Sequence, residues 1–166
     1  GADVIKVEAL AGDGTRWAAE GEARPVFSDD PQHNLTFEIE NGNKKSVSMD
    51  LKDPECFDAL MTLLSKADVF VTNWRPKALK KLGLDYESLK ERFPKLVYAS
   101  ATGFGEDGPD CDLPGYDFTA FWTRSGILGS LYERGTEPMN IIPSMGDRAA
   151  AMCLCSGILA ALYNAQ

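Results

Sequence analysis

The residue best suited to carry chemistry is Asp147, which follows Gly146 and precedes an almost uncharged run rich in alanine and leucine, residues 149–162. This run predicts a helix that is buried on most of its circumference. Asp147 then stands at or just before the helix N-terminus, where unpaired N–H groups and the helix dipole favour an ionised carboxylate. Such a carboxylate, shielded from bulk water on one side, is suited to attack an activated acyl group. The alternative interpretation is a plain helix N-cap.

Size and charge set limits on the function. The chain has 166 residues, 44% of them hydrophobic, which is enough for the core of one domain. Its net charge of −8 argues against general nucleic-acid binding but leaves room for an anionic small molecule held by local lysines and arginines. We find no secretory or lipidation signal and no apolar run of about 18 residues, so we expect a soluble cytoplasmic protein without a membrane partner.

The chain contains four cysteines and one histidine, His33. Cys153 and Cys155 are two residues apart on a predicted helix, so they point to different sides and do not pair easily. We therefore expect buried free thiols in a reducing cytoplasm and no metal site. The chain starts within a predicted strand and ends at the apolar helix without a cap, and we interpret it as part of a longer protein.

The hydrophobic pattern predicts alternating strands and helices. Continuous apolar runs predict strands at 4–7, 69–71 and 96–101, and alternating apolar and polar residues predict one at 46–51. Residues 35–39 fit either a strand or a short helical turn, and Asn41–Asn43 predict a turn after them. Helices are predicted at 54–64, opened by Asp53 and Pro54, and at 118–126. Between them, two short helical pieces are predicted to end near Gly83 and Phe93, the second opened by Asp85. Residues 17–34, which include His33, are predicted to form a surface loop. This order indicates a parallel α/β arrangement in which the continuous apolar runs form buried strands, with 69–71 buried on both faces.

Parallel sheets bind ligands beyond the carboxyl ends of their strands, which here are residues 73–75 and 102–108. The segment Gly103–Gly108 is almost a dinucleotide-binding loop, but Pro109 and polar turn residues follow it where that fingerprint requires a helix. A glycine-rich turn at 11–16 carries Arg16, which is either a ligand contact or an ordinary turn residue.

Several short motifs, in this order, resemble those of the class III CoA-transferases, the superfamily of formyl-CoA transferase and carnitine CoA-transferase. They are Gly1–Glu8, Asn41–Ser46, Ala67–Pro76, Gly108–Pro109, Pro114–Asp117 and Gly146–Asp147. Within the superfamily, Glu40–Lys45 and Pro114–Ala120 are most similar to the branch of anaerobic bacteria that transfers CoA among (R)-phenyllactate or (R)-2-hydroxyisocaproate and the matching enoyl-CoA in amino-acid fermentation.

The resemblance implies an α/β fold with a Rossmann-like parallel sheet and flanking helices, as a fragment of the large domain of an interlocked homodimer. Residues 1–166 would be part of that domain. The family's N-terminal CoA-binding loop would precede them, and its lid and second domain would follow. The expected partners are an acyl-CoA and a carboxylic acid, with CoA as part of the substrate.

By the same resemblance, Asp147 matches the family nucleophile, which forms an aspartyl intermediate with the acyl group and then with CoA. Gly146 would leave room for the thioester, and N–H groups at the helix start would stabilise the oxyanion. The family's CoA contacts fall on Met49, Lys52, Asn73, Trp74, Arg75, Ala78, Lys81 and Tyr116. Ala9 stands where formyl-CoA transferases have an arginine next to the nucleotide. The contact that this arginine makes is either absent here or made by Arg16 or Arg75.

For these positions simpler interpretations stay open. Lys52 and Lys81 suit CoA phosphates, and Trp74 suits the adenine, but Lys81 also fits a solvated helix surface and Trp74 a core aromatic. The aromatic residues from 116 to 122 fit either a wall of the acyl pocket or the core. The sequence does not specify the acyl group.

Two other functions compete with CoA transfer. An α-methylacyl-CoA racemase of the same superfamily uses a histidine beside its aspartate, but this chain has Tyr116 at that position, and a phenol is a poor general base at neutral pH. A non-catalytic α/β module that binds CoA or a nucleotide is the other alternative.

Overall fold

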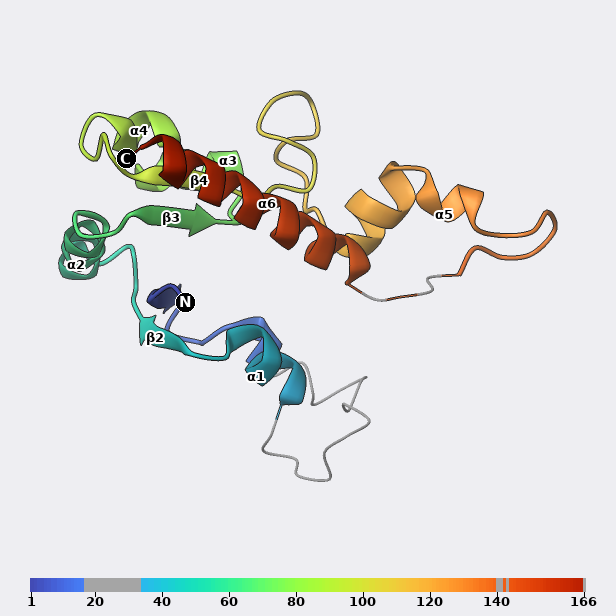
Figure 1. The fold of residues 1–166 in the computed structure, drawn as a ribbon, viewed down its shortest axis with the longest axis horizontal. Helices are drawn as coiled ribbons and strands as arrows, with labels where there is room; N and C mark the ends of the chain where they lie inside the picture. Colours follow the sequence, from blue (N-terminus) through green and yellow to red (C-terminus); the bar gives the residue numbers. More distant parts are fainter. Residues whose placement is uncertain (17–33, 140–141, 143, 166) are drawn as a thin grey trace. The chain divides into compact units, whose positions relative to one another are not determined.

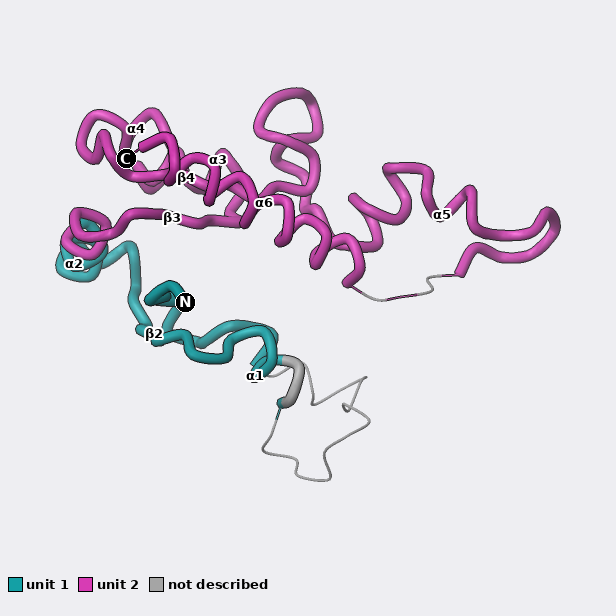
Figure 2. The backbone as a smooth tube through the Cα atoms, in the orientation of Figure 1, with its two compact units in different colours: residues 1–61 teal, residues 62–166 magenta. Residues whose placement is uncertain are grey.

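The computed structural model describes residues 1–16, 34–139, 142 and 144–165. Most of the predicted surface loop, with His33, lies outside the described residues. The chain divides into two compact units, Gly1–Met61 and Thr62–Gln166, shown in different colours in Figure 2.

Unit 1 is built on a pair of parallel strands, β1 (Val4–Glu8) and β2 (Lys44–Ser48). Val4 is paired with Lys44 and Glu8 with Ser48, and the backbone N–H of Met49 extends the pairing by donating to the Glu8 carbonyl at 2.9 Å. A short 3₁₀ helix, η1 (Gly14–Arg16), follows β1. The predicted parallel pairing is confirmed here, although β2 begins and ends earlier than the alternation indicates.

The ambiguous segment at 35–39 is helical. It forms α1 (Leu35–Asn41), because the Asn34 side chain accepts a hydrogen bond from the Phe37 N–H at 3.0 Å and so caps the first turn. The predicted turn after it is confirmed, with Asn43 in the left-handed region at φ 63°. That conformation suits asparagine better than most residues and lets the chain enter β2 directly.

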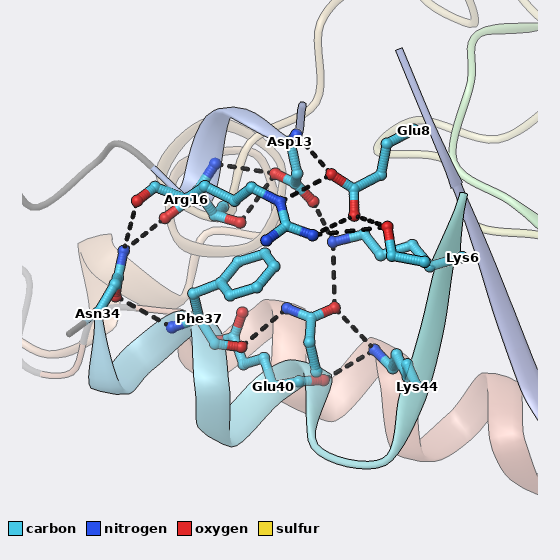
Figure 3. A network of polar contacts seen from close by, with 11 residues as sticks. Lys6, Glu8, Asp13, Arg16, Asn34, Phe37, Glu40 and Lys44 are labelled. Carbon is cyan, nitrogen blue, oxygen red and sulfur yellow. Dashed lines mark hydrogen bonds and ion pairs between the residues drawn. The ribbon is translucent and has the colours of Figure 1, made fainter. Parts of the chain in front are cut away.

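A buried carboxylate organises unit 1 (Figure 3). The Glu8 side chain accepts hydrogen bonds from Arg16 Nε at 2.8 Å and Nη2 at 2.7 Å, from Ser46 Oγ at 2.7 Å, and from the Asp13 N–H at 2.9 Å. The Arg16 guanidinium also lies over the Phe37 ring, 4.2 Å from its centroid. Arg16 thus connects η1 and α1 to the strands, so its turn is more than an ordinary loop. Its Nε and Nη2 groups both donate to Glu8.

The helix α2 (Pro54–Leu64) begins in unit 1 and ends in unit 2. As predicted, Asp53 caps it: Asp53 Oδ1 accepts from the N–H groups of Glu55 at 2.9 Å and Cys56 at 3.1 Å. Pro54 fits the first helical position because its missing N–H would have no helical partner there.

Unit 2 continues with β3 (Val69–Thr72), α3 (Pro76–Leu82), α4 (Tyr86–Lys90) and β4 (Val97–Ser100). The strands β3 and β4 are parallel, with Val69 paired with Val97 and Thr72 with Ser100. Gly83 ends α3 with a left-handed φ of 69°, and Asp85 caps α4 through the Ser88 N–H at 3.3 Å. These two helix boundaries were predicted from the sequence.

The core of unit 2 contains one residue from each of several elements, including Leu79, Leu89, Ala99 and Trp122. Tyr98 packs edge-on against Phe70 and donates its hydroxyl to the Leu84 carbonyl at 3.1 Å. Burial raises the pKa of Tyr98 to about 12, because the phenolate would lose its hydration.

The prediction that the strand at 69–71 is buried on both faces is wrong, and so is the predicted burial of the strand at 4–7. The side chain of Val71 in β3 is 54% exposed, and Val4 and Ile5 in β1 are exposed as well. A continuous apolar run is buried on both sides only where elements cover both faces of its sheet. The described residues form two separate two-stranded sheets, each with an open face.

The C-terminal part of unit 2 holds η3 (Asp117–Arg124), a π-helix at the place of the predicted helix, then α5 (Ile127–Ser130) and α6 (Met145–Asn164). The last helix, red in Figure 1, contacts η3 and β4. It is longer than predicted, because it begins before Asp147 instead of after it.

The predicted burial of this last helix is also wrong. Gly146 is its one buried residue among those described, and the Tyr163 side chain is 78% exposed. Since its apolar side chains surround the helix, η3 and β4 cover only part of them. The helix α6 has 20 residues, and with a mean hydropathy of 1.3 over an 18-residue window it is long and apolar enough to cross a membrane, contrary to the expectation that no such run exists. The core helix of a soluble protein meets the same criterion.

The cysteines are free thiols, as predicted, but they are less buried than expected. Cys56 and Cys111 are half-buried, whereas Cys153 and Cys155 on α6 are exposed. Cys153 and Cys155 are exposed because α6 itself is exposed, whereas their predicted burial assumed a buried helix.

The Glu8 network makes the stability of unit 1 dependent on pH. The hydrogen bonds from Arg16, with those from Ser46 and Asp13, lower the pKa of Glu8 from 4.5 to about 2 in spite of its burial. Because the pKa of Glu8 is lower in the folded state than in the unfolded state, the ionised Glu8 side chain stabilises the fold. This stabilisation is complete above pH 4.5 and is lost as the pH falls toward 2. We expect Glu8→Gln to reduce the pH dependence of the free energy of unfolding in that range, measured by urea titration followed by circular dichroism.

A matched control is Glu40→Gln, which alters an exposed carboxylate in the same unit. It should keep the pH dependence of the wild-type chain. Equal dependence in all three proteins would contradict the structural role of Glu8.

Candidate functional site

Asp147 lies in the first turn of α6, at its third residue, and its side chain is exposed. The predicted position at a helix N-terminus is confirmed, but the N-cap interpretation is wrong, because the N-cap residue is Ser144. Ser144 adopts a left-handed conformation, φ 59° and ψ 21°, and its own side chain does not cap the helix. The N–H groups of this first turn therefore need an acceptor from elsewhere in the chain.

That acceptor is Asp117, the first residue of η3, whose side chain is 7% exposed. Asp117 Oδ1 accepts from the N–H groups of Gly146 at 2.7 Å and Asp147 at 3.3 Å. Asp117 Oδ2 accepts from the Ser144 N–H at 3.0 Å and from the Trp122 indole N–H at 3.0 Å. One buried carboxylate thus caps α6 and joins it to η3.

Gly146 is required by this packing. A Cβ at this position would overlap with the Phe121 side chain and lie 2.7 Å from Asp117 Oδ1. The space beside Gly146 is therefore filled by protein, which corrects the expectation that it leaves room for a thioester. The N–H groups of Gly146 and Asp147 are bound to Asp117, so the oxyanion role expected of the helix start does not fall on these two groups.

The carboxyl ends of β3 and β4 are joined through the loop that follows β4. Gly103 and Gly115 pack backbone to backbone, and a Cβ on Gly115 would lie 3.0 Å from the Gly103 nitrogen. Arg75 Nη1 donates to the Asp112 carbonyl at 3.1 Å, and the Lys77 N–H donates to Asp112 Oδ1 at 3.0 Å. The start of α3, the loop and the segment before η3 are thereby connected.

Among the predicted site residues of unit 2, Arg75 takes part in these contacts. Asn73, Trp74 and Arg75 directly follow β3 and are exposed, and Tyr116 directly follows the close approach of Gly115. Trp74 is 44% exposed, so its interpretation as a core aromatic is wrong. The grouping of these residues as a CoA site stays a prediction.

The other predicted contacts lie on α3 and in unit 1. On α3, Ala78 is half-buried and Lys81 is exposed near the helix end. In unit 1, Met49 is half-buried beside β2, and the exposed Lys52 donates its N–H to Asp50 Oδ1 at 3.0 Å. Met49 and Lys52 are not part of the contacts that hold the site of unit 2.

The aromatic residues of η3 have different environments. Tyr116 is 70% exposed and Phe118 is exposed, whereas Trp122 is buried against Asp117 and Phe121 packs on Gly146. For Trp122 and Phe121, the core interpretation is therefore correct. Among the described residues, no group of three or more histidine, cysteine, aspartate or glutamate side chains is placed to hold a metal ion.

Residues 1–166 match the sequence model of CoA-transferase family III. The chain belongs to this family. It is 51% identical over 166 residues to cinnamoyl-CoA:phenyllactate CoA-transferase of Clostridium sporogenes, and 45% identical over 164 residues to (R)-2-hydroxy-4-methylpentanoate CoA-transferase of Clostridioides difficile. These matches cover 100% and 99% of this chain but 40% of each relative.

A solved structure of a CaiB/BaiF family protein from Brucella suis is also similar to the chain. It has a TM-score of 0.84 and 36% sequence identity, over 98% of this chain and 42% of the solved one. The family predicted from the short motifs is thus confirmed, as is the mixed α/β fold with parallel strands.

Asp117 is the site residue whose role no sequence pattern indicated, and the contact of Phe121 with Gly146 was not expected either. Asp117 belongs to the Pro114–Asp117 motif, in which no separate role was expected for it. Its partners, Ser144 and Gly146, are far away along the chain, and capping at that distance follows no sequence period. The available signal was an aspartate at the start of an aromatic-rich helix, which is also typical of an ordinary cap.

The tight packing at Gly146 predicts a clear effect of an added methyl group. We expect Gly146→Ala to lower the free energy of unfolding by about 1–3 kcal/mol, because the methyl group overlaps with Phe121 and displaces Asp117. Urea unfolding followed by circular dichroism measures this change.

Gly157→Ala, on the same helix but with no atom near the added Cβ, is the matched control. It should raise stability by about 1 kcal/mol through helix propensity alone. Equal effects of the two substitutions would show that the contacts at Gly146 do not matter.

Proposed function

We propose that the complete protein transfers CoA between an acyl-CoA and a carboxylic acid, with Asp147 as the nucleophile. The proposal is made for the complete protein because the chain spans about 40% of the length of the relatives it matches. Family membership supports the reaction class. The observation that carries the role of Asp147 is its position: an exposed carboxylate on a helix turn whose backbone is held by a buried acceptor.

The proposed reaction has balanced steps. A carboxylate oxygen of Asp147 attacks the thioester carbonyl, the C–S bond breaks, and CoA leaves as a thiolate, which produces a mixed anhydride. The thiolate then attacks the Asp147 carbonyl of the anhydride and expels the first carboxylate product. The acceptor carboxylate attacks the resulting aspartyl-CoA thioester and releases the thiolate, which finally takes the acceptor acyl group and regenerates Asp147.

For CoA binding in the complete protein we propose the residues that match the family's CoA contacts. They are Met49, Lys52, Asn73, Trp74, Arg75, Ala78, Lys81 and Tyr116. The exposed lysines suit the CoA phosphates, and the exposed Trp74 ring suits the adenine. Arg75 is exposed and donates through Nη1 to the Asp112 carbonyl at 3.1 Å, which places its guanidinium at the loop beyond β3.

The substrate we propose is a 2-hydroxy acid such as phenyllactate, or its CoA thioester. This proposal rests on the similarity to the phenyllactate and 2-hydroxy-4-methylpentanoate CoA-transferases of the two clostridial species, and on the exposed aromatic rings of Tyr116 and Phe118. We further propose that the complete protein is a cytoplasmic homodimer in the amino-acid fermentation of an anaerobic bacterium. The large exposed apolar surface of α6 supports a further protein contact there.

The covalent role of Asp147 can be tested by trapping. The complete protein is incubated with cinnamoyl-CoA, quenched with hydroxylamine and analysed by peptide mass spectrometry. We expect a mass change confined to the peptide that contains Asp147, and loss of CoA exchange in Asp147→Asn, because an amide is a far weaker nucleophile.

Glu55→Gln, which changes an exposed carboxylate on α2, is the control and should keep wild-type exchange. Exchange in Asp147→Asn at the wild-type rate would refute the nucleophile and favour a non-catalytic module. An unlabelled Asp147 with α-carbon epimerisation would favour a racemase.

Two neighbouring lysines test the proposed phosphate contact. We expect Lys81→Ala to raise KM for acyl-CoA several-fold with little change in kcat, because a phosphate contact binds ground state and transition state alike. The effect should decrease at high ionic strength. Lys80→Ala, which removes the adjacent exposed charge on α3, should leave KM near its wild-type value; equal effects would indicate only a general loss of positive charge.

A further inference from the structure

We propose that Asp117 is the positioning residue of the site: its buried carboxylate holds the turn from Ser144 to Asp147 in the one orientation that presents Asp147 to the acyl-CoA. This inference rests on the proposed function of Asp147 as nucleophile. It goes beyond that function because it assigns the control of the nucleophile to a residue on another helix.

The division of hydrogen bonds between the two oxygens of Asp117 is the first support. Oδ1 accepts from Gly146 at 2.7 Å and from Asp147 at 3.3 Å, so one of the donors is the backbone of the proposed nucleophile itself. Oδ2 accepts from Ser144 at the start of the turn, at 3.0 Å. The carboxylate therefore holds the turn at both of its ends.

The conformation of the turn is the second support. Ser144 has a φ of 59°, a left-handed conformation that is unfavourable for a residue with a Cβ. Its own hydroxyl does not cap the helix, so the turn lacks the usual local stabilisation. The hydrogen bonds to Asp117 offset this cost, and the shape of the turn depends on them.

The packing around Asp117 is the third support, because a positioning group must itself be fixed. The indole N–H of Trp122, a residue only 2% exposed, donates to Asp117 Oδ2 at 3.0 Å and holds the carboxylate in place. On the other side, the Phe121 side chain lies against Gly146, where no Cβ would fit. The relation between η3 and the first turn of α6 is thus determined by both packing and hydrogen bonds.

The chemistry explains why such precision would affect the reaction. A nucleophile must approach a carbonyl carbon at close range and in the correct direction, and a displacement of about 1 Å can lower the rate about 100-fold. An exposed carboxylate on a loose turn would sample many directions. Holding the backbone at Ser144, Gly146 and Asp147 limits these directions.

The decisive variant is Asp117→Asn in the complete protein. An amide has one acceptor oxygen and one NH₂ group, so it cannot accept from both sets of N–H donors, and the NH₂ group faces donors. We expect kcat to fall about 100-fold while KM for cinnamoyl-CoA changes less than about twofold. The rate of trapping at Asp147 should fall by the same factor as kcat.

A stability control separates positioning from general weakening. Leu89→Val removes a methylene group from a buried side chain of α4 and lowers stability without touching η3 or the start of α6. It should leave kcat and the trapping rate unchanged at a temperature where both variants are folded. A kcat loss in Leu89→Val equal to that in Asp117→Asn would overturn the proposal, as would wild-type kcat in a folded Asp117→Asn.

Asp117→Glu keeps the carboxylate but moves it by one methylene group. Its kcat should lie between those of Asp117→Asn and the wild type, with KM unchanged. If Asp117→Asn does not fold, Asp117→Glu decides, and a wild-type kcat in that variant overturns the proposal. Asp147→Asn is measured in parallel: exchange in that variant refutes the nucleophile, whereas its inactivity together with an active Asp117→Asn refutes only the positioning role.

Discussion

A single buried carboxylate, Asp117, connects the packing of unit 2 to its proposed chemistry. Burying a carboxylate is unfavourable unless hydrogen bonds replace its lost hydration, and here four N–H groups do so. Three of these N–H groups come from the start of α6, where a helix otherwise leaves its backbone donors unpaired. The same hydrogen bonds therefore replace the lost hydration of the carboxylate and provide acceptors for the unpaired N–H groups of the helix.

The close approach of backbone segments is the second constraint on the site. Gly146 lies against Phe121, and Gly103 lies against Gly115, at distances that leave no space for a side chain. These contacts bring the segment after β4 to the start of η3, and η3 to α6. Unit 1 uses a comparable solution at Glu8, where a buried carboxylate pairs with Arg16 and joins η1 to the strands. In both units, a buried acid holds together segments that lack an extended sheet.

The helix α6 differs from a typical core helix because most of its apolar side chains are exposed. Apolar side chains surround the helix, but the described contacts with η3 and β4 cover only part of it. Such a surface is expected to be covered by further protein, and the chain spans about 40% of the length of its clostridial relatives. The proposed homodimer and the proposed activity therefore both belong to the complete protein.

The sequence alone determined the features that depend on neighbouring residues. Asp53 with Pro54, Gly83 and Asp85 mark helix ends because their effects are local, and the apolar runs identify the parallel strands. The short motifs likewise identified the family. Only the tertiary structure decided that Asp117 caps α6, that Phe121 fills the space beside Gly146, and that α6 and Val71 are exposed. These features depend on which distant segments meet, and no local pattern or period in the sequence encodes such a meeting.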